Sequence, residues 1–237
     1  MEFERGGAAV SLLSPDESLD INVKMLDINM SVRRFLPDPS IALAHEKRFL
    51  SGDFVNMPFT RTAVRHRQLH AGVLTTAISG IFSGQLPYSM IAVFLTNEQQ
   101  NMISHDPYVF KNHGLKKFHI SKNGVNIPQE PITVGGDGGG TTLRGYTHFV
   151  ENTGSSILSS TNGITPLDFI NKSFFMAFDL TPDFCLGAHN HKPEIGNIDL
   201  HLQFDKPTTV PLTVMIMACY ENVVKISKDT VQLDYAL

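Results

Sequence analysis

Two histidines and a glutamate stand close together late in the chain, in an arrangement that could bind a metal ion. One residue separates His189 from His191, and Glu194 follows them. On an extended segment, residues two apart point to the same side, so both imidazoles could face one ion. A nearby carboxylate could complete the coordination shell. The candidate metal site of the sequence is therefore His189, His191 and Glu194.

The same segment resembles the metal motif of the cupins, which are also β-barrels, but it departs from that motif. Two residues separate His191 from Glu194, where the cupin motif has three or four. A cupin also needs another histidine on a later strand, and His201 is the sole histidine after Glu194. Pro193 interrupts the segment as well. These departures favour a solvated loop, and a cupin-like metalloenzyme is kept as the disfavoured alternative.

Other motifs that could support catalysis or phosphate binding lack an essential part. The glycine-rich run at 135–140 lacks the Gly-Lys-Ser/Thr ending of a phosphate-binding loop. The sequence contains no Gly-x-Ser-x-Gly motif for acyl transfer. Asp179 and Asp183 flank Leu-Thr-Pro, a pattern typical of a turn at a strand end. We therefore predict no catalytic residue, no cofactor and no enzymatic activity.

A basic cluster lies between positions 61 and 70. Arg61, Arg65 and Arg67 share the parity of one strand face. They could contact phosphate, but the net charge of −4 and the pI of about 6.2 argue against a protein that coats nucleic acid. We interpret the three arginines as a charged strand face or a subunit interface, and we predict no sequence-specific binding of nucleic acid.

The composition is that of a globular protein. Hydrophobic residues make up 42% of the 237 residues, enough to bury a sizeable core. Cys185 and Cys219 lie outside any Cys-x-x-Cys pattern, which predicts two buried thiols and no disulfide framework. No apolar run approaches the ~18 residues that a membrane span needs. Residues 1–13 do not have the pattern of a signal peptide.

The stretch 79–98 is expected to contain a central strand. Between Ser89 and Leu95 the residues of both parities are apolar, which is typical of a strand that is covered on both faces. The Asn123-Gly124 pair predicts a two-residue hairpin turn between two more strands at 117–128. Such strands need further strands beside them, and the rest of the chain supplies candidates.

Alternating or apolar patterns predict these further strands, and capping residues predict short helices. The expected strands are at 19–35, 59–69, 173–180, 198–204, 210–218, 220–226 and 231–235. The expected helices are at 39–50, where Asp38 is the cap, at 143–153, and as a capped turn at 165–168. Many strands, few helices and no βαβ rhythm favour an antiparallel sandwich or barrel.

Four stretches, taken together and in order, resemble the major capsid protein of Polinton (Maverick) elements and of the related adintoviruses. They are PSIALAH at 39–45 with a glycine at 52, FSGQLP at 82–87, FDLTPD at 178–183, and YENVVKI at 220–226. The resemblance covers residues 14–235 and is to the C-terminal of the two jelly rolls in that protein. It implies an all-β fold, an eight-stranded antiparallel jelly-roll sandwich with short helices in the connections.

The resemblance also implies a structural role. In that family three chains form a capsomer, so the expected partners are the chain itself, as a homotrimer, and other capsid subunits of an icosahedral shell. The expected location is the virion capsid, after synthesis and assembly in the cytoplasm or nucleus of the host cell. The family has a strand at 61–69, which supports the interface interpretation of the arginines.

The length of the chain leaves its organisation open between several alternatives. We expect an N-terminal arm at 1–18 and a single jelly-roll domain at 19–237. Such a chain would be a fragment, a split or decayed copy, or a protein that uses a lone jelly roll. The main functional alternative is a minor capsid protein, a penton protein or a binding module for carbohydrate or a host receptor.

Overall fold

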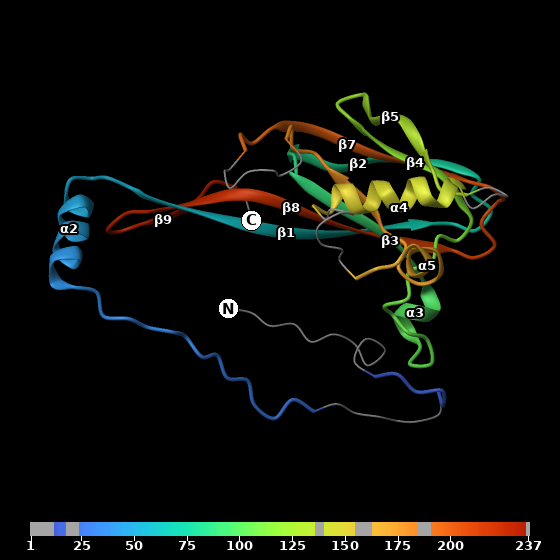
Figure 1. Cartoon of the computed structure of the whole chain (residues 1–237). Coiled ribbons are helices and arrows are strands. Elements are labelled where there is room, and N and C mark those ends of the chain that lie inside the picture. Colours follow the sequence, from blue (N-terminus) through green and yellow to red (C-terminus); the bar gives the residue numbers. More distant parts are fainter. Residues whose placement is uncertain (1–11, 18–23, 136–139, 155–162, 184–190, 236–237) are drawn as a thin grey trace. The chain divides into compact units, whose positions relative to one another are not determined.

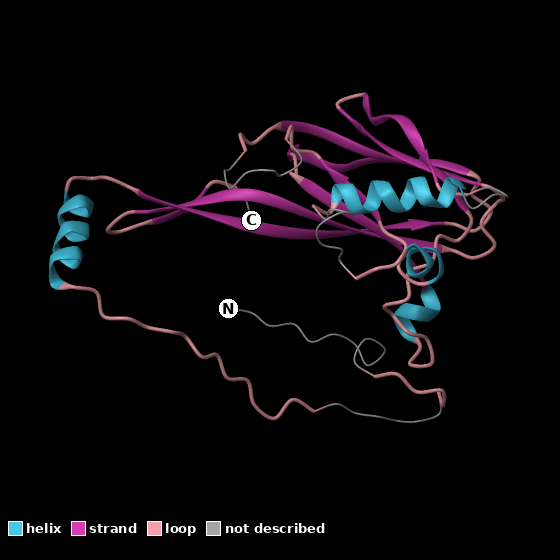
Figure 2. Ribbon diagram, viewed as in Figure 1, coloured by secondary structure: helices cyan, strands magenta, loops and turns pink. Residues whose placement is uncertain are grey.

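The chain folds mainly into β-strands (Figure 1; Figure 2). The computed structural model describes residues 12–17, 24–135, 140–154, 163–183 and 191–235, and these contain nine strands and four helices. The strands are β1 (Val55–Leu69), β2 (Thr75–Gln85), β3 (Ser89–Thr96), β4 (Leu115–Lys122), β5 (Val125–Thr133), β6 (Met176–Asp179), β7 (Ile195–Phe204), β8 (Leu212–Ile226) and β9 (Val231–Leu233). The helices are α2 (Pro39–Leu50), α3 (Asn97–Asn101), α4 (Gly140–Asn152) and α5 (Pro166–Asn171).

The described strands form two sheets. One has the order β1-β8-β3-β6, with β9 paired to β8, and the other has the order β2-β7-β4-β5. The strands are therefore paired from the outside of the chain inward: β1 with β8, β2 with β7, β3 with β6, and β4 with β5. Successive pairs alternate between the two sheets, which is the path of a jelly roll. The predicted all-β jelly roll with short helices is confirmed, and β9, a strand expected at 231–235, pairs with β8 outside the eight strands of this path.

Contacts divide the chain into two units. The first comprises Met1–Asp20 and Thr62–Tyr220, and the second comprises Ile21–Arg61 and Glu221–Leu237. Two boundaries between the units lie inside strands: one falls within β1, between Arg61 and Thr62, and the other within β8, between Tyr220 and Glu221. The expected division into an arm at 1–18 and one domain at 19–237 stays a prediction.

The hydrophobic core lies in the first unit, between the two sheets. Aromatic rings from opposite sheets meet in this core, with the ring centre of Phe94 of β3 at 5.8 Å from that of Phe204 of β7 and the ring centre of Phe118 of β4 at 5.6 Å from that of Phe178 of β6. All four side chains are at most 1% exposed. Rings at this separation pack in tilted or edge-on geometry, which holds the two inner faces together.

Strand β3 is central, as its sequence predicts. It pairs with β6 on one side and with β8 on the other. Phe94 faces the core with 0% exposure, while Val93 and Leu95 of the opposite face are 3% and 8% exposed. Burial on both faces explains why the residues of both parities are apolar.

The local turn and cap signals of the sequence also form. The Asp38 carboxylate accepts a hydrogen bond from the Ser40 backbone at 2.9 Å and begins α2. Thr165 and Asp168 form a reciprocal capping box at the start of α5. The Asn123-Gly124 pair has positive φ at both positions and joins β4 to β5.

The strand expected at 19–35 is wrong for the part that the structure describes. Residues 24–38 form neither a helix nor a strand, and their side chains are exposed. An alternating apolar pattern becomes a strand only where a neighbouring strand takes up its backbone hydrogen bonds. The residues from 18 to 23 lie outside the described residues.

Candidate interaction surfaces

The structure gives separate polar partners to the two described residues of the predicted metal site. His191 Nε2 lies 2.8 Å from Asp183 Oδ1, and Glu194 forms an ion pair with Lys122. His189 lies outside the described residues. Among the residues that are described, no three histidine, cysteine or acidic side chains gather where they could share a metal ion. The metal site stays a prediction that depends on His189.

Of four further residues or stretches singled out in the sequence, the structure describes two. The Asp179 carboxylate accepts hydrogen bonds from the Thr181 backbone and hydroxyl at 2.9 and 2.6 Å, which is the turn chemistry expected there. Cys219 is a free thiol that is half-buried, where a buried thiol was expected. Cys185 and residues 136–139 of the glycine-rich run lie outside the described residues.

The three predicted interface arginines lie on β1, which is an edge strand of its sheet. Within the second unit, Arg61 donates to Asn222 Oδ1 at 3.3 Å and its guanidinium lies 4.5 Å from the centre of the Tyr235 ring. Within the first unit, the Arg65 guanidinium lies 5.7 Å from the centre of the Phe82 ring. Arg67 donates to the His66 carbonyl at 3.1 Å. The interface role stays a prediction, and two of these arginines also stack on aromatic rings of the chain itself.

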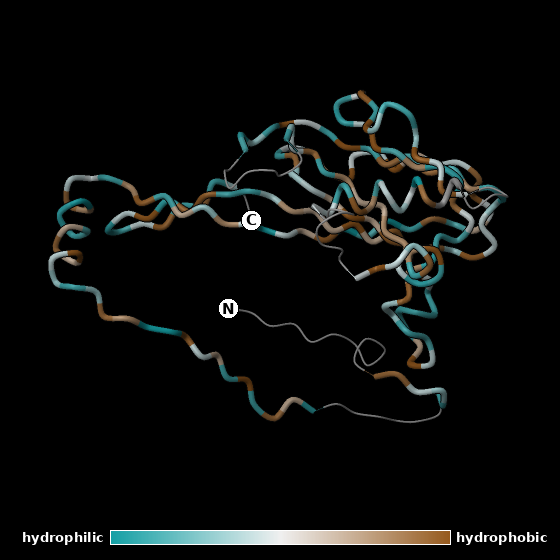
Figure 3. Tube along the Cα trace, in the orientation of Figure 1, coloured by the Kyte–Doolittle hydropathy of each residue, from teal (hydrophilic) through white to brown (hydrophobic). Residues whose placement is uncertain are grey.

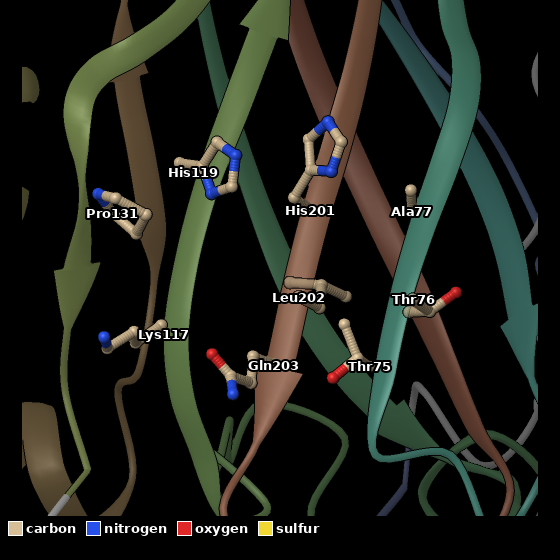
Figure 4. Close-up of a pocket in the computed structure, with 9 residues that line it drawn as sticks. All are labelled: Thr75, Thr76, Ala77, Lys117, His119, Pro131, His201, Leu202 and Gln203. Carbon is tan, nitrogen blue, oxygen red and sulfur yellow. The ribbon is translucent and has the colours of Figure 1, made fainter.

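A pocket of about 290 Å³ lies on the sheet formed by β2, β7, β4 and β5 (Figure 4). Its lining residues are Thr75, Thr76, Ala77, Lys117, His119, Pro131, His201, Leu202 and Gln203. His119 and His201 are directly paired across β4 and β7, and their rings stack with centres 4.5 Å apart. Burial lowers the pKa of His119 below its usual 6.5, and the neighbouring His201 lowers it further. The His119 imidazole is therefore neutral at pH 7 and becomes charged only in acid.

Sequence reasoning missed this histidine pair. The alternation at 198–204 indicates an outward position for His201, but the partner of this histidine depends on the register between β4 and β7, which are far apart in the chain. The only signal in the sequence is a histidine at an outward position in each strand. That signal does not say which strands are neighbours.

Residues 24–36, named the apolar arm here, expose an unusual number of large hydrophobic side chains. In Figure 3, hydrophobic and hydrophilic segments alternate along this stretch. The exposed side chains are Met25, Leu26, Ile28, Met30, Val32, Phe35 and Leu36, at 53% to 98% of their full area. Helix α2, which the structure describes in full, follows the arm and buries none of its side chains. Contiguous exposed apolar surface of this kind marks a site of interaction.

A second apolar surface lies in the first unit and is named the apolar groove here. It has a volume of about 320 Å³. Its lining residues are His66, Leu95, Gln99, Gln100, Pro107, Tyr108, Phe110 and Met215. They come from β1, from the continuous stretch of β3, α3 and the segment after α3, and from β8, so three separated parts of the chain build the groove. The Tyr108 side chain is 64% exposed, which leaves its ring open to a partner.

Hydrogen bonds fix one wall of this groove. Thr96 and Gln99 form a reciprocal capping box at the start of α3. The Gln99 side-chain amide also donates to the Val109 carbonyl at 2.6 Å and to the Asp106 carbonyl at 3.3 Å. Gln99 is 8% exposed, so these bonds satisfy an amide that would be costly to bury alone. The segment after α3 is therefore held against the helix, and the groove is preformed.

The fold of the chain is similar to that of viral major capsid proteins. VP54 of PBCV-1, fitted into a reconstruction of the virophage Sputnik, has a TM-score of 0.50 at 12% identity, over 81% of this chain and 54% of VP54. A chain of the Sputnik virophage has a TM-score of 0.42 at 14% identity, over 78% of this chain and 39% of its own length. A chain of the PBCV-1 capsid has a TM-score of 0.46 at 11% identity, over 81% and 55%.

At these identities the similarity concerns the fold. The chain spans about half the length of the VP54 chain that it matches. No protein-family model matches the sequence, and no curated protein matches it. Among the described residues, no helix combines the length and the apolar character that crossing a membrane requires.

Proposed function

We propose that this chain is a structural subunit of a viral capsid and that it assembles with copies of itself and with other capsid subunits. The observation that carries the proposal is the jelly roll itself, whose fold is similar to that of VP54. A rigid sandwich with a large aromatic core suits a subunit that must keep its shape while neighbouring subunits contact its edges.

The exposed surfaces of the chain support assembly over catalysis. The apolar arm and the apolar groove each present hydrophobic side chains to solvent, which is the signature of surfaces that bind other proteins. Aromatic and aliphatic side chains of the described residues fill the core between the sheets. The proposed role is therefore that of a binding and building element without enzymatic activity.

At a finer level, we propose a major capsid subunit of the Polinton and adintovirus type, or its C-terminal jelly roll, which forms a homotrimer in the virion capsid after assembly inside the host cell. The four motif stretches given above support this assignment. A minor capsid protein, a penton protein or a binding module is the second candidate, because the outer pocket with His119 and His201 could take a ligand.

Light scattering coupled to size-exclusion chromatography tests the proposal. The chain at a series of concentrations is expected to form trimers, and electron microscopy of the concentrated fractions is expected to show ring-shaped capsomers or larger shells. A chain that stays strictly monomeric at high concentration, in a well-folded state by circular dichroism, would contradict a capsid role.

A further inference from the structure

We propose that the apolar arm of one copy of the chain binds in the apolar groove of a second copy. The inference deepens the proposed function, since it names the two surfaces through which copies associate. The two surfaces are of opposite shape: the apolar arm is an extended segment and the apolar groove is concave.

The apolar arm has the form of an extended segment whose exposed side chains become buried when it binds a partner. Leu26, Ile28, Met30 and Val32 occupy alternate positions, so in an extended conformation they lie on one side. They are 53% to 86% exposed in the isolated chain. Because residues 24–36 belong to no helix or strand, they can enter a groove without breaking existing secondary structure. Extended segments of this kind bind by inserting alternate side chains into apolar pockets.

The groove has the capacity and the chemistry to take such side chains. A cavity of about 150 Å³ holds one benzene molecule. The groove volume of about 320 Å³ therefore accommodates two large apolar side chains, such as Met30 and Val32. Leu95, Phe110 and Met215 supply apolar walls, and the hydrogen-bonded Gln99 keeps the opening in place. A preformed groove does not need to be ordered on binding.

Charge complements shape beside the groove. Arg33 and Arg34 follow Val32 directly, and both are exposed. Glu98 stands next to the groove residue Gln99, with 60% of its side chain exposed. The exposed Asp106 carboxylate accepts a hydrogen bond from the backbone of Tyr108, another groove residue, at 2.8 Å. Glu98 and Asp106 line the adjacent pocket, which shares Gln99 with the groove. With Val32 in the groove, the two arginines would extend toward these carboxylates, which favours one direction of the bound arm.

A second copy is the occupant because each chain carries both surfaces. A contact between two different surfaces of identical chains passes from copy to copy and closes into a ring when the rotation allows it. No partner of another kind is needed to cover either surface. Where the rotation closes, the same contact produces a closed oligomer of the kind that the proposed function requires.

Charge-swap variants of the full-length chain test the contact by sedimentation velocity at about 150 mM salt. Arg33→Glu with Arg34→Glu, and separately Glu98→Lys with Asp106→Lys, are each expected to weaken self-association at least about ten-fold, because like charges then face each other. Combining all four substitutions in one chain is expected to restore association. The matched control Lys47→Glu with Arg48→Glu changes an exposed basic pair on α2 and is expected to leave association unchanged.

Photo-crosslinking identifies the occupant directly. With p-benzoylphenylalanine at position 32, illumination is expected to give a covalent dimer whose crosslink maps to residues 95–110 of the other copy. A crosslink within a single chain would overturn the second-copy assignment. Normal self-association of every swap variant would overturn the arm contact while leaving the proposed function intact. A monomeric wild-type chain would contradict both the arm contact and the proposed function. Unaltered circular dichroism of the variants shows that they fold.

Discussion

Acid is expected to destabilise the fold through the side chain of His148. This residue lies on α4, and its ring makes edge contacts with Phe118 and Phe178 at centre distances of 5.9 and 5.7 Å. Its Nδ1 accepts a hydrogen bond from the Asn152 amide at 3.1 Å, while its buried Nε2 has no hydrogen-bond partner among the described residues. A charge on this ring would therefore be poorly solvated.

The pKa of His148 gives the size of the expected loss in the free energy of unfolding. Burial lowers this pKa from 6.5 to about 4, the Ala177 backbone opposes the change, and the Arg144 charge adds to it. Between these two pH values the unfolded chain binds a proton at this site and the folded chain does not, so the free energy of unfolding falls as the pH falls. At about 1.4 kcal/mol per pH unit, the loss between pH 7 and pH 4 is about 3 kcal/mol.

Urea unfolding at pH 7, 5.5 and 4 measures this loss. The His148→Phe variant keeps an aromatic ring beside Phe118 and removes the titrating group, and His148→Gln serves if the larger ring does not fit. Wild type is expected to lose about 3 kcal/mol more than either variant between pH 7 and pH 4. The control His105→Gln changes an exposed histidine and is expected to follow wild type. Equal pH dependence in wild type and both His148 variants would refute the reasoning.

Three further variants and one elemental analysis have expected outcomes. Phe118→Ala removes a core ring that is 1% exposed and is expected to cost about 3–5 kcal/mol in urea unfolding. Thr165→Ala removes the capping box of α5 and is expected to cost about 1 kcal/mol, visible as a lower melting temperature. If β1 is an interface, Arg65→Ala with Arg67→Ala reduces self-association in light scattering without unfolding the chain, and unchanged association would reject that role. Elemental analysis of the purified protein is expected to show no stoichiometric metal, and one equivalent of zinc would revive the predicted metal site.

The sequence predicts the parts of the fold that depend on neighbouring residues. The cap at Asp38, the capping box at Thr165 and the hairpin turn at Asn123 are each set by a few consecutive residues, and all three form as expected. The apolar run of β3 is equally readable, because burial on both faces leaves no polar position in the alternation. The jelly-roll path itself came from the resemblance of four stretches to a family.

The parts that depend on distant residues were missed. The alternation at 19–35 has the same form as that of β7, and only the presence of a neighbouring strand separates the two outcomes. The His119–His201 pair needs the register between β4 and β7. The apolar groove needs β1, β3, β8 and the segment after α3 to meet, and no local pattern indicates that meeting. Periodicity reports which residues are buried, not which partner buries them.

The pairing of strands from the outside of the chain inward also sets the order in which the chain can fold. The β4–β5 hairpin closes a loop of two residues, whereas β1 and β8 are separated by more of the chain than any other pair in the sheets. Closing a longer loop costs more entropy, so pairing is easiest at the hairpin and hardest between β1 and β8. We expect refolding on the millisecond-to-second scale that is typical of such distant pairings. The pairing of the edge strand β1 with β8 would form late, so newly made chains would expose β1 before the two sheets pack together.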